Sequence, residues 1–152
     1  MKNSATKSCI LAYNQILKEC DTIYHEAAVR AGVSDCAFWI LYALQDSDHT
    51  LTQSEIGNNA SMPRQTVNSA LKKLEKDGFL TLRKIEGKMG KSIHLTRRGE
   101  QFVRQHILPV AAAEERACAQ FSEEEQRAFL ATFRALADRL KEEIMTIEPE
   151  AT

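Results

Sequence analysis

The sequence has few of the residues that mark loop-rich or membrane-spanning chains. Only six of its 152 residues are Gly and three are Pro, which excludes a collagen-like or loop-dominated architecture. The longest uninterrupted apolar run, Cys36 to Leu44, has nine residues, and a membrane-spanning helix needs about 20. Residues 1–8 are polar and lack the apolar segment of a secretion signal. We therefore expect a cytoplasmic protein with no membrane association.

Cysteine and histidine are also sparse and widely spaced. The four cysteines form no CxxC pair, and the four histidines show no HxxxH or HExxH spacing. This pattern argues against a disulfide framework, a zinc finger and a metal-sensing site. The sequence also lacks a phosphate-binding glycine loop, a nucleophile elbow and paired catalytic carboxylates in a recognisable motif. We expect neither a cofactor nor enzymatic activity.

The net charge of −1 conceals a strongly uneven distribution. Residues 63–98 carry ten Lys/Arg and three acidic residues, a local charge of +7, whereas the rest of the chain carries ten and eighteen, a charge of −8. This asymmetry indicates a polyanionic partner for the middle third of the chain.

The N-terminal part of the sequence predicts two helices. Apolar residues from about Cys9 to Ala31 step by three and four, which is a heptad pattern, and Gly32 ends this helix. A second row of apolar residues lies beside the first, so this helix needs more than one partner surface. Ser34 or Asp35 then caps a helix over residues 36–45, which is apolar nearly all round and therefore central. With 43% apolar residues, the chain can build one domain with a real core.

Residues 52–78 predict two short helices joined by a tight turn. Thr52 and Glu55 form a capping box for a helix that ends near Asn59. Pro63 suits the first turn of the next helix, which runs to Asp77 and is stopped by Gly78. The predicted buried stripe of that second helix consists of Val67, Ala70, Leu71 and Leu74.

After Gly78 the apolar period changes from 3.6 to 2, which predicts a hairpin of strands near residues 80–83 and 93–95. Thr96 caps a helix over residues 97–118, which Pro109 should kink or interrupt. A second capping box, Ser122 with Glu125, opens a helix that runs to about Ile147. Its apolar face consists of Phe129, Phe133, Leu136, Leu140, Ile144 and Ile147. The fold class is mainly α with a small β-hairpin.

Two short helices with a polar, basic second helix form the layout of a helix-turn-helix, whose second helix enters the major groove of DNA. Arg64 suits a bidentate contact to guanine, Gln65 and Asn68 suit adenine, and a phosphate suits Thr66 or Ser69. Lys72 lies on the same outer side of the helix. An ordinary solvated helix face is the alternative interpretation of this pattern.

The predicted hairpin is basic as well. It carries Arg83, Lys84, Lys88 and Lys91. Beside a helix-turn-helix it would lie along the sugar-phosphate backbone or enter the minor groove. A lysine-protected sheet edge is the alternative, which needs no ligand. Because the two features follow one another directly, DNA binding is the favoured interpretation.

Three segments together resemble the MarR family of bacterial transcription regulators: Leu51–Gly57, Met62–Leu80 and Ile93–Glu100. The resemblance covers almost the whole chain. It implies one domain over residues 1–152, with a winged helix-turn-helix lobe at about 35–96 and dimerisation helices at about 9–31 and 97–147. It also implies a homodimer on a palindromic operator, most often a repressor that a small molecule releases. The resemblance further implies that base- and phosphate-facing positions of the recognition helix are Arg64, Gln65, Thr66, Asn68 and Ser69, and that Lys88 and Lys91 fall in the wing.

One segment departs from the family pattern. Many members carry an aspartate and a tip arginine in the wing, whereas the segment from Glu86 to Lys91 has neither. Because lysine lacks the planar fork of arginine, we expect looser, phosphate-directed wing contacts.

The resemblance also raises the question of what the regulator senses. A small aromatic effector would bind between the dimer helices and the DNA-binding lobe, against Tyr13, Tyr24, Phe38, Trp39 and Tyr42. Aromatic rings at helical spacing are more often plain core, which is the alternative interpretation. Two alternatives to an effector-responsive repressor remain. One is a helical adaptor or anti-activator that keeps the fold without specific DNA binding, and the other is a thiol-based redox regulator.

The redox alternative depends on the environment of the four cysteines. Cys9 lies near the predicted start of the first helix, a position that favours a reactive thiolate. However, all four cysteines fall on apolar helices, so we expect buried, inert thiols at positions 9, 20, 36 and 118. Cys9 and Cys20 are roughly 16 Å apart along one helix, and they cannot bridge within it.

Overall fold

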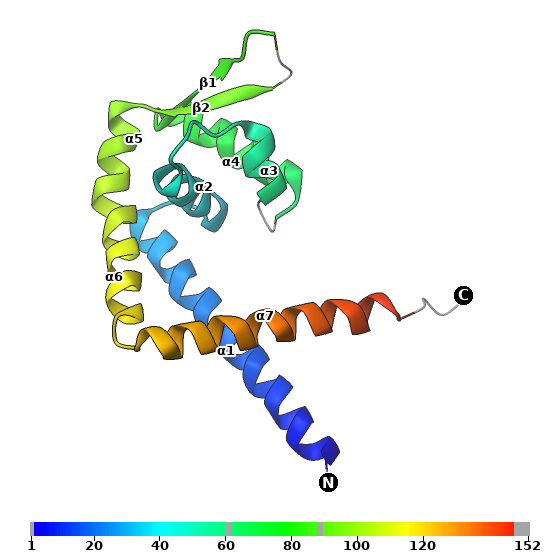
Figure 1. The fold of residues 1–152 in the computed structure, drawn as a ribbon. Helices are drawn as coiled ribbons and strands as arrows, with labels where there is room; N and C mark the ends of the chain where they lie inside the picture. The colour runs from blue at the N-terminus through cyan, green and yellow to red at the C-terminus, as the bar shows by residue number, and fades with distance from the viewer. Residues whose placement is uncertain (1, 60–61, 88–89, 148–152) are drawn as a thin grey trace. The chain divides into compact units, whose positions relative to one another are not determined.

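The structure, a computed structural model, describes residues 2–59, 62–87 and 90–147. Their order along the chain is α1 (Lys2–Ala31), α2 (Asp35–Asp46), α3 (Gln53–Asn59), α4 (Arg64–Lys76), β1 (Leu80–Lys84), β2 (Lys91–Leu95), α5 (Arg97–Phe102), the π-helix η1 (Val103–Ile107), α6 (Leu108–Cys118) and α7 (Glu123–Met145). The chain divides into two compact units, residues 1–110 and 111–152. The predicted fold class, mainly α with one hairpin, is confirmed (Figure 1).

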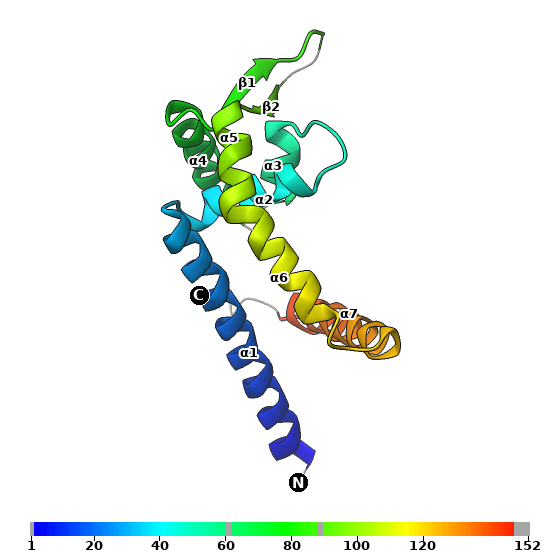
Figure 2. The ribbon, with the colours of Figure 1, turned by 90° about the vertical axis from the view of Figure 1, so that its left-hand side faces the viewer.

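Helix α1 begins at Lys2, seven residues before the predicted start at Cys9. Its C-terminus is as predicted: Gly32 has a φ of 74°, its amide donates to Val29, and the amide of Val33 donates to Ala28. This double hydrogen bond is a Schellman motif, and it turns the chain sharply into α2. Much of α1 extends away from the rest of its unit (Figure 2), and it leaves Leu11, Ile16, Ile23 and Val29 exposed.

The core of the first unit forms around α2. The Ser34 hydroxyl caps this helix by accepting from the Ala37 amide at 3.2 Å. Phe38 and Leu41 are fully buried, as are Val67 and Leu71 of α4. Burying each such side chain contributes roughly 1.5–3 kcal/mol, so these contacts fix α4 against α2.

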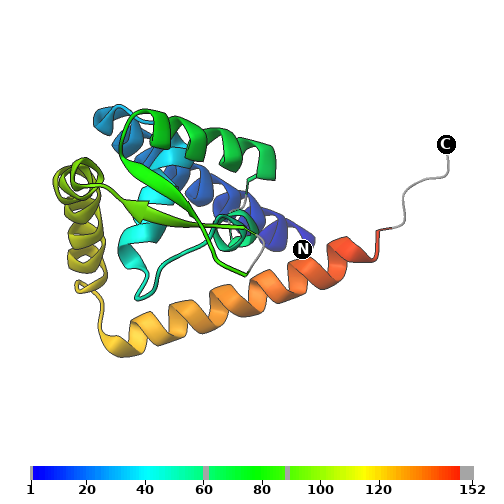
Figure 3. The same ribbon diagram turned by 90° about the horizontal axis from the view of Figure 1, so that it is seen from above.

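The hairpin is antiparallel, and Leu80 pairs with Leu95 and Lys84 with Lys91. Leu80 and Ile93 point into the core. Seen from above, the two strands leave the side of the unit where α5 begins and extend past α3 (Figure 3).

Thr96 and Gly99 join the hairpin to α5. The Thr96 hydroxyl accepts from the Gly99 amide at 3.1 Å and donates to the Gly78 carbonyl at 2.6 Å. A Cβ atom on Gly99 would overlap the carbonyl oxygen of Phe79, so α5 approaches the turn after α4 closely enough to require glycine.

The expected interruption near Pro109 takes the form of the π-helix η1. The Leu108 amide, at the end of η1, donates to the Val103 carbonyl five residues earlier. Pro109 has no amide to continue the α-helical pattern, and its ring would clash with the carbonyl four residues before it. The wider π turn removes that clash without ending the helix.

The second unit contains most of α6, a short turn and α7. The predicted capping box is present: the Ser122 amide donates to Glu125 at 2.8 Å, and the Glu125 amide donates to the Ser122 hydroxyl at 3.2 Å. Phe129 and Phe133 stack on each other with ring centroids 5.6 Å apart. No residue of α7 is buried, although its apolar stripe is continuous.

Among the described residues, no single helix has the length and apolar composition of a membrane span; α1 and α2, taken together across their 90° bend, pass that test by length and composition alone.

Candidate nucleic-acid interface

The start of α3 is held by the predicted capping box. The Thr52 amide donates to a Glu55 carboxylate oxygen at 2.7 Å, and the Glu55 amide donates to the Thr52 hydroxyl at 3.2 Å. The Thr52 hydroxyl also donates to that carboxylate, and these bonds lower the pKa of Glu55. His49 lies within hydrogen-bonding distance of Asp48 and Glu55, and these two contacts raise its pKa. The preceding loop is therefore tied to the helix that it introduces.

Helix α4 presents one apolar and one polar side. The predicted stripe is confirmed, because Val67, Ala70, Leu71 and Leu74 are all buried. Pro63 stands one position earlier than predicted: it is the N-cap residue and lies just outside the first turn. The candidate DNA-contacting side chains on this helix are all exposed: Arg64, Gln65, Thr66, Asn68, Ser69 and Lys72.

Two interactions at the ends of α4 were not predicted from the sequence. The Arg64 guanidinium donates through Nη2 to the Asn58 side-chain carbonyl of α3 at 3.0 Å. The Glu75 carboxylate accepts from the Leu82 amide of β1 at 2.9 Å. The first bond joins α3 to α4, and the second joins α4 to the hairpin.

The hairpin is tied to α3 as well. The Ile93 amide donates to the Leu51 carbonyl at 2.8 Å, and Thr52 forms a β-bridge with Ser92. The hairpin, α4 and α3 with the two residues before it are thus connected pairwise by hydrogen bonds, which fixes the backbone positions from which the basic side chains of α4 and of the hairpin extend.

The outer ends of β1 and β2 carry basic side chains, and the turn between them has an exposed acidic residue, Glu86. Arg83, Lys84 and Lys91 are exposed, and Lys84 lies directly opposite Lys91 in the strand register. Like charges in this position destabilise a hairpin unless an anion lies between or beside them. Lys88, the fourth predicted contact in the wing, lies outside the described residues. The arrangement is compatible with a polyanion beside the strand ends and with a lysine-protected sheet edge.

The five aromatic residues predicted to line an effector pocket include one compact group. Tyr24, Phe38, Trp39 and Tyr42 have ring centroids 4.8–6.5 Å apart along the group. Tyr13 lies further along α1 and is half-buried. Phe38 is fully buried whereas Trp39 is 37% exposed, so the group has one face in the core and one outside it.

Two open pockets lie elsewhere in the first unit, and neither is lined by these five rings. The larger, of about 1100 Å³, lies between the end of α1, the start of α2 and α4. Its lining includes His25, Asp35, Cys36, Gln65 and Lys73. Nδ1 of His25 lies within hydrogen-bonding distance of the Asp35 carboxylate, at 2.9 Å, at the junction of α1 and α2.

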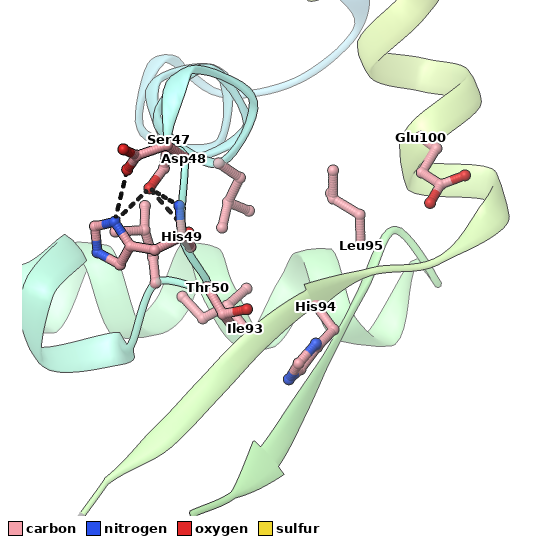
Figure 4. A pocket seen from close by; sticks show the side chains of 10 residues that line it. Ser47, Asp48, His49, Thr50, Ile93, His94, Leu95 and Glu100 are labelled. Carbon is pink, nitrogen blue, oxygen red and sulfur yellow. Dashed lines mark hydrogen bonds and ion pairs between the residues drawn. The ribbon is translucent and has the colours of Figure 1, made fainter.

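The smaller pocket, of about 410 Å³, lies between the α2–α3 loop, β2 and α5 (Figure 4). His49, His94 and Glu100 come from these three elements, but His49 and His94 point in different directions and Glu100 stands apart from both. Among the described residues, no three His, Cys, Asp or Glu side chains are grouped closely enough to hold a metal ion.

The prediction of four buried thiols is wrong for three of them. Cys36 is buried, and burial raises the pKa of its thiol. Cys9, Cys20 and Cys118 are exposed, because the apolar faces of their helices are not covered within the chain. Cys9 also lies about two turns inside α1, not near its start as predicted.

Comparison with known proteins was consistent across sequence and structure. The model of the MarR family matches residues 31–87. The HTH-type transcriptional repressor YetL of Bacillus subtilis (strain 168) is 30% identical over 136 residues, which cover 86% of this chain and 79% of YetL.

Many solved structures share the fold, and the following two are among them. A MarR family transcription regulator superposes with a TM-score of 0.76 at 20% identity, over 96% of this chain and 97% of its own. The MepR–DNA complex of S. aureus superposes with a TM-score of 0.67 at 21% identity, over 86% of this chain and 96% of the MepR chain.

Proposed function

This chain belongs to the MarR family of transcription regulators, and on that premise we propose that it is a dimeric repressor that reads a palindromic operator and leaves it when a small molecule binds. The proposal includes no enzymatic activity and no cofactor, and it assigns the protein to the cytoplasm, where bacterial DNA lies. The observation that carries it is the joined set of α3, α4 and the hairpin, with its outward polar and basic side chains.

We assign reading of base edges to Arg64, Gln65 and Asn68, which are exposed on the first two turns of α4. Thr66, Ser69 and Lys72 are assigned to phosphates, together with the wing residues Arg83, Lys84, Lys88 and Lys91. The name of YetL supports repression, and the DNA complex of MepR supports DNA as the partner. The local charge of +7 is unexplained if the chain is only a helical adaptor.

Dimerisation is proposed from the uncovered apolar surfaces. Exposed large apolar side chains gather on α1 and α7, in an amount that monomeric proteins rarely leave in water. A second copy of the chain is the occupant that a two-fold palindromic operator requires, and dimer symmetry would place two α4 helices about one DNA turn apart.

We propose that a small aromatic effector binds against the aromatic group of Tyr24, Phe38, Trp39 and Tyr42. Tyr13, which lies further along α1, is proposed to belong to the same site. Trp39 is the only tryptophan of the chain and is partly exposed. A compound that binds there should change the fluorescence of Trp39 at the same concentrations at which it releases DNA. A compound that releases DNA but leaves the fluorescence of Trp39 unchanged would show that the effector binds elsewhere in the molecule.

Operator binding is tested by selecting duplexes from a randomised library with the purified protein and measuring anisotropy against shuffled controls near ~150 mM salt, where non-specific binding is weak. We expect a palindromic selected site that is preferred by at least about a thousand-fold. Equal, weak binding to every duplex would favour the adaptor alternative and overturn the proposal.

The redox alternative is tested on the same complex. We expect peroxide to leave operator binding unchanged, because the exposed thiols of Cys9, Cys20 and Cys118 lie on α1 and α6, outside the elements assigned to DNA. The fourth thiol, Cys36, is buried, and burial raises its pKa, which disfavours the thiolate that peroxide attacks. Loss of binding on oxidation, reversed by a reductant and absent after replacement of Cys9, Cys20 or Cys118, would favour a redox regulator.

A further inference from the structure

The hydrogen bond between Arg64 and Asn58 crosses the turn between the two helices of the helix-turn-helix. Arg64 is the first residue of α4, and Asn58 is the last residue but one of α3. The bond runs from Nη2 of Arg64 to the side-chain carbonyl oxygen of Asn58, over 3.0 Å. Both side chains are exposed, so packing does not hold either of them in place.

The geometry restricts an otherwise free side chain. An exposed arginine has many rotamers, and binding a base edge requires only a few of them. A helix C-terminus carries partial negative charge, so the end of α3 attracts the guanidinium to the same place. One of the five N–H donors of Arg64 is used by Asn58, and enough donors remain for a two-bond contact with N7 and O6 of a guanine.

The same hydrogen bond could instead compete with DNA. If guanine and Asn58 required the same donors, the bond to Asn58 would keep Arg64 from contacting the base. Removing that bond would then strengthen binding of the protein to its operator. The donor geometry favours cooperation, because Nη2 carries two hydrogens, one on the edge shared with Nε and one on the edge shared with Nη1. The bond to Asn58 uses one of these edges and leaves the other for a two-bond contact with guanine.

We propose that Asn58 is a positioning residue that fixes the orientation in which Arg64 reads guanine, and that it thereby helps to choose the operator without touching DNA. This inference rests on the proposed function, since it needs an operator to read. It adds a specificity-determining residue on α3 to a reading surface assigned to α4 alone.

The test is a double-mutant cycle on DNA preference. The proteins are the wild type, Asn58→Ala, Arg64→Ala and the double variant, each measured by anisotropy on the selected operator and on a shuffled duplex. We expect Asn58→Ala to reduce the operator preference by about 3- to 30-fold, part of the roughly 5- to 100-fold loss expected for a complete bidentate contact. In the Arg64→Ala background, Asn58→Ala should change the preference by less than about twofold.

A second readout identifies the atom that is read. Replacing the operator guanines one at a time by 7-deazaguanine removes the N7 acceptor. The wild type should lose affinity at one guanine in each half-site, and Asn58→Ala should lose most of that sensitivity. Asn58→Asp keeps an acceptor oxygen for Arg64 and should retain both the preference and the sensitivity, which makes it the matched control. Equal thermal unfolding of the variants would exclude a folding defect as the cause.

Three results would overturn the proposal: tighter operator binding by Asn58→Ala, an unchanged preference, or the same loss in the Arg64→Ala background as in the wild type. These results are distinguishable from failure of the proposed function. If the proposed function were wrong, the wild type itself would prefer no selected duplex. The assignments of both Arg64 and Asn58 would then be wrong.

Discussion

Helices α4 and α7 carry the same kind of apolar stripe, and the chain covers only one of them. In α4, Val67 and Leu71 are 0% exposed, whereas in α7 Phe129 is 63% exposed and Ile144 53%. The period of the stripe is the same, so it shows that both helices need a cover without showing where the cover comes from. The stripe of α4 is covered by other parts of the same chain. The stripe of α7 is not, and its cover has to come from a partner.

The largest expected effect comes from charging the uncovered stripe. Phe129→Asp combined with Phe133→Asp places two carboxylates where we propose that a second copy packs, and it should weaken dimerisation by about a thousand-fold or more. Sedimentation equilibrium at micromolar concentration measures this. Arg134→Ala, an exposed polar change on the same helix, should leave the dimer intact. A dimeric double-Asp variant would place the interface elsewhere.

The covered stripe should respond differently. Leu71→Ala opens a cavity in the core between α2 and α4, and we expect it to lower the free energy of unfolding by about 2–5 kcal/mol. Chemical denaturation at a fixed protein concentration measures the change. Lys72→Ala, at the next and exposed position, should change it by less than about 0.5 kcal/mol. Similar losses of unfolding free energy in Leu71→Ala and Lys72→Ala would contradict the contrast in burial between these two positions of α4.

The comparison can be sharpened within the DNA-binding lobe. Arg64→Ala or Asn68→Ala should lower the operator preference more than the affinity for random DNA, by roughly 5- to 100-fold, because base contacts are lost. Lys91→Ala, or Lys88→Ala, should lower both affinities alike and reduce the slope of log affinity against log salt by about 1. Anisotropy over a salt series separates these outcomes. Equal losses on operator and random DNA from the α4 variants would remove the base-reading assignment.

The smallest expected effect concerns a feature that the two compact units share, a capping box at the start of a helix. Glu55 at α3 and Glu125 at α7 close capping boxes with Thr52 and Ser122, and hydrogen bonds from those residues lower the pKa of each carboxyl. A pKa that is lower in the folded state gives stability that is present above the unfolded value, about 4.5, and lost as the pH falls through the lowered value.

Replacing either glutamate by Gln keeps a hydrogen-bonding side chain but removes its titration. Thermal unfolding is followed from pH 6 to pH 3. The decrease in Tm over this range should be smaller in Glu55→Gln and in Glu125→Gln than in the wild type, by a few degrees or less. An effect in only one variant would show that the two capping boxes are not equivalent.

Local chemistry allowed much of the fold to be predicted from the sequence. Both capping boxes, the glycine stops after α1 and α4, and the buried stripe of α4 depend on residues within one or two helical turns of each other. The start of α1 was missed, because residues 2–8 are polar and show no apolar period, while a helix can continue through such a segment.

The features that the sequence did not predict depend on distant residues. The contact between Asn58 and Arg64 needs the angle of the turn between α3 and α4, and that between Glu75 and Leu82 needs the position of the hairpin. Exposure of Cys9, Cys20 and Cys118 was missed because apolar spacing was equated with burial inside one chain. The spacing of an amide side chain six residues before an arginine, across a turn, is the one sequence signal for the Asn58 contact.

The close approach of Gly99 to the Phe79 carbonyl has a genetic consequence. Every single-base missense change in a glycine codon adds a Cβ atom, and at position 99 that atom has no room. The obstruction lies where α5 meets the residues that follow α4, outside every position assigned to DNA. A selection for derepressed mutants should therefore recover Gly99 alleles repeatedly, and a geneticist who mapped only such alleles would mistake a packing position for part of the operator-reading surface.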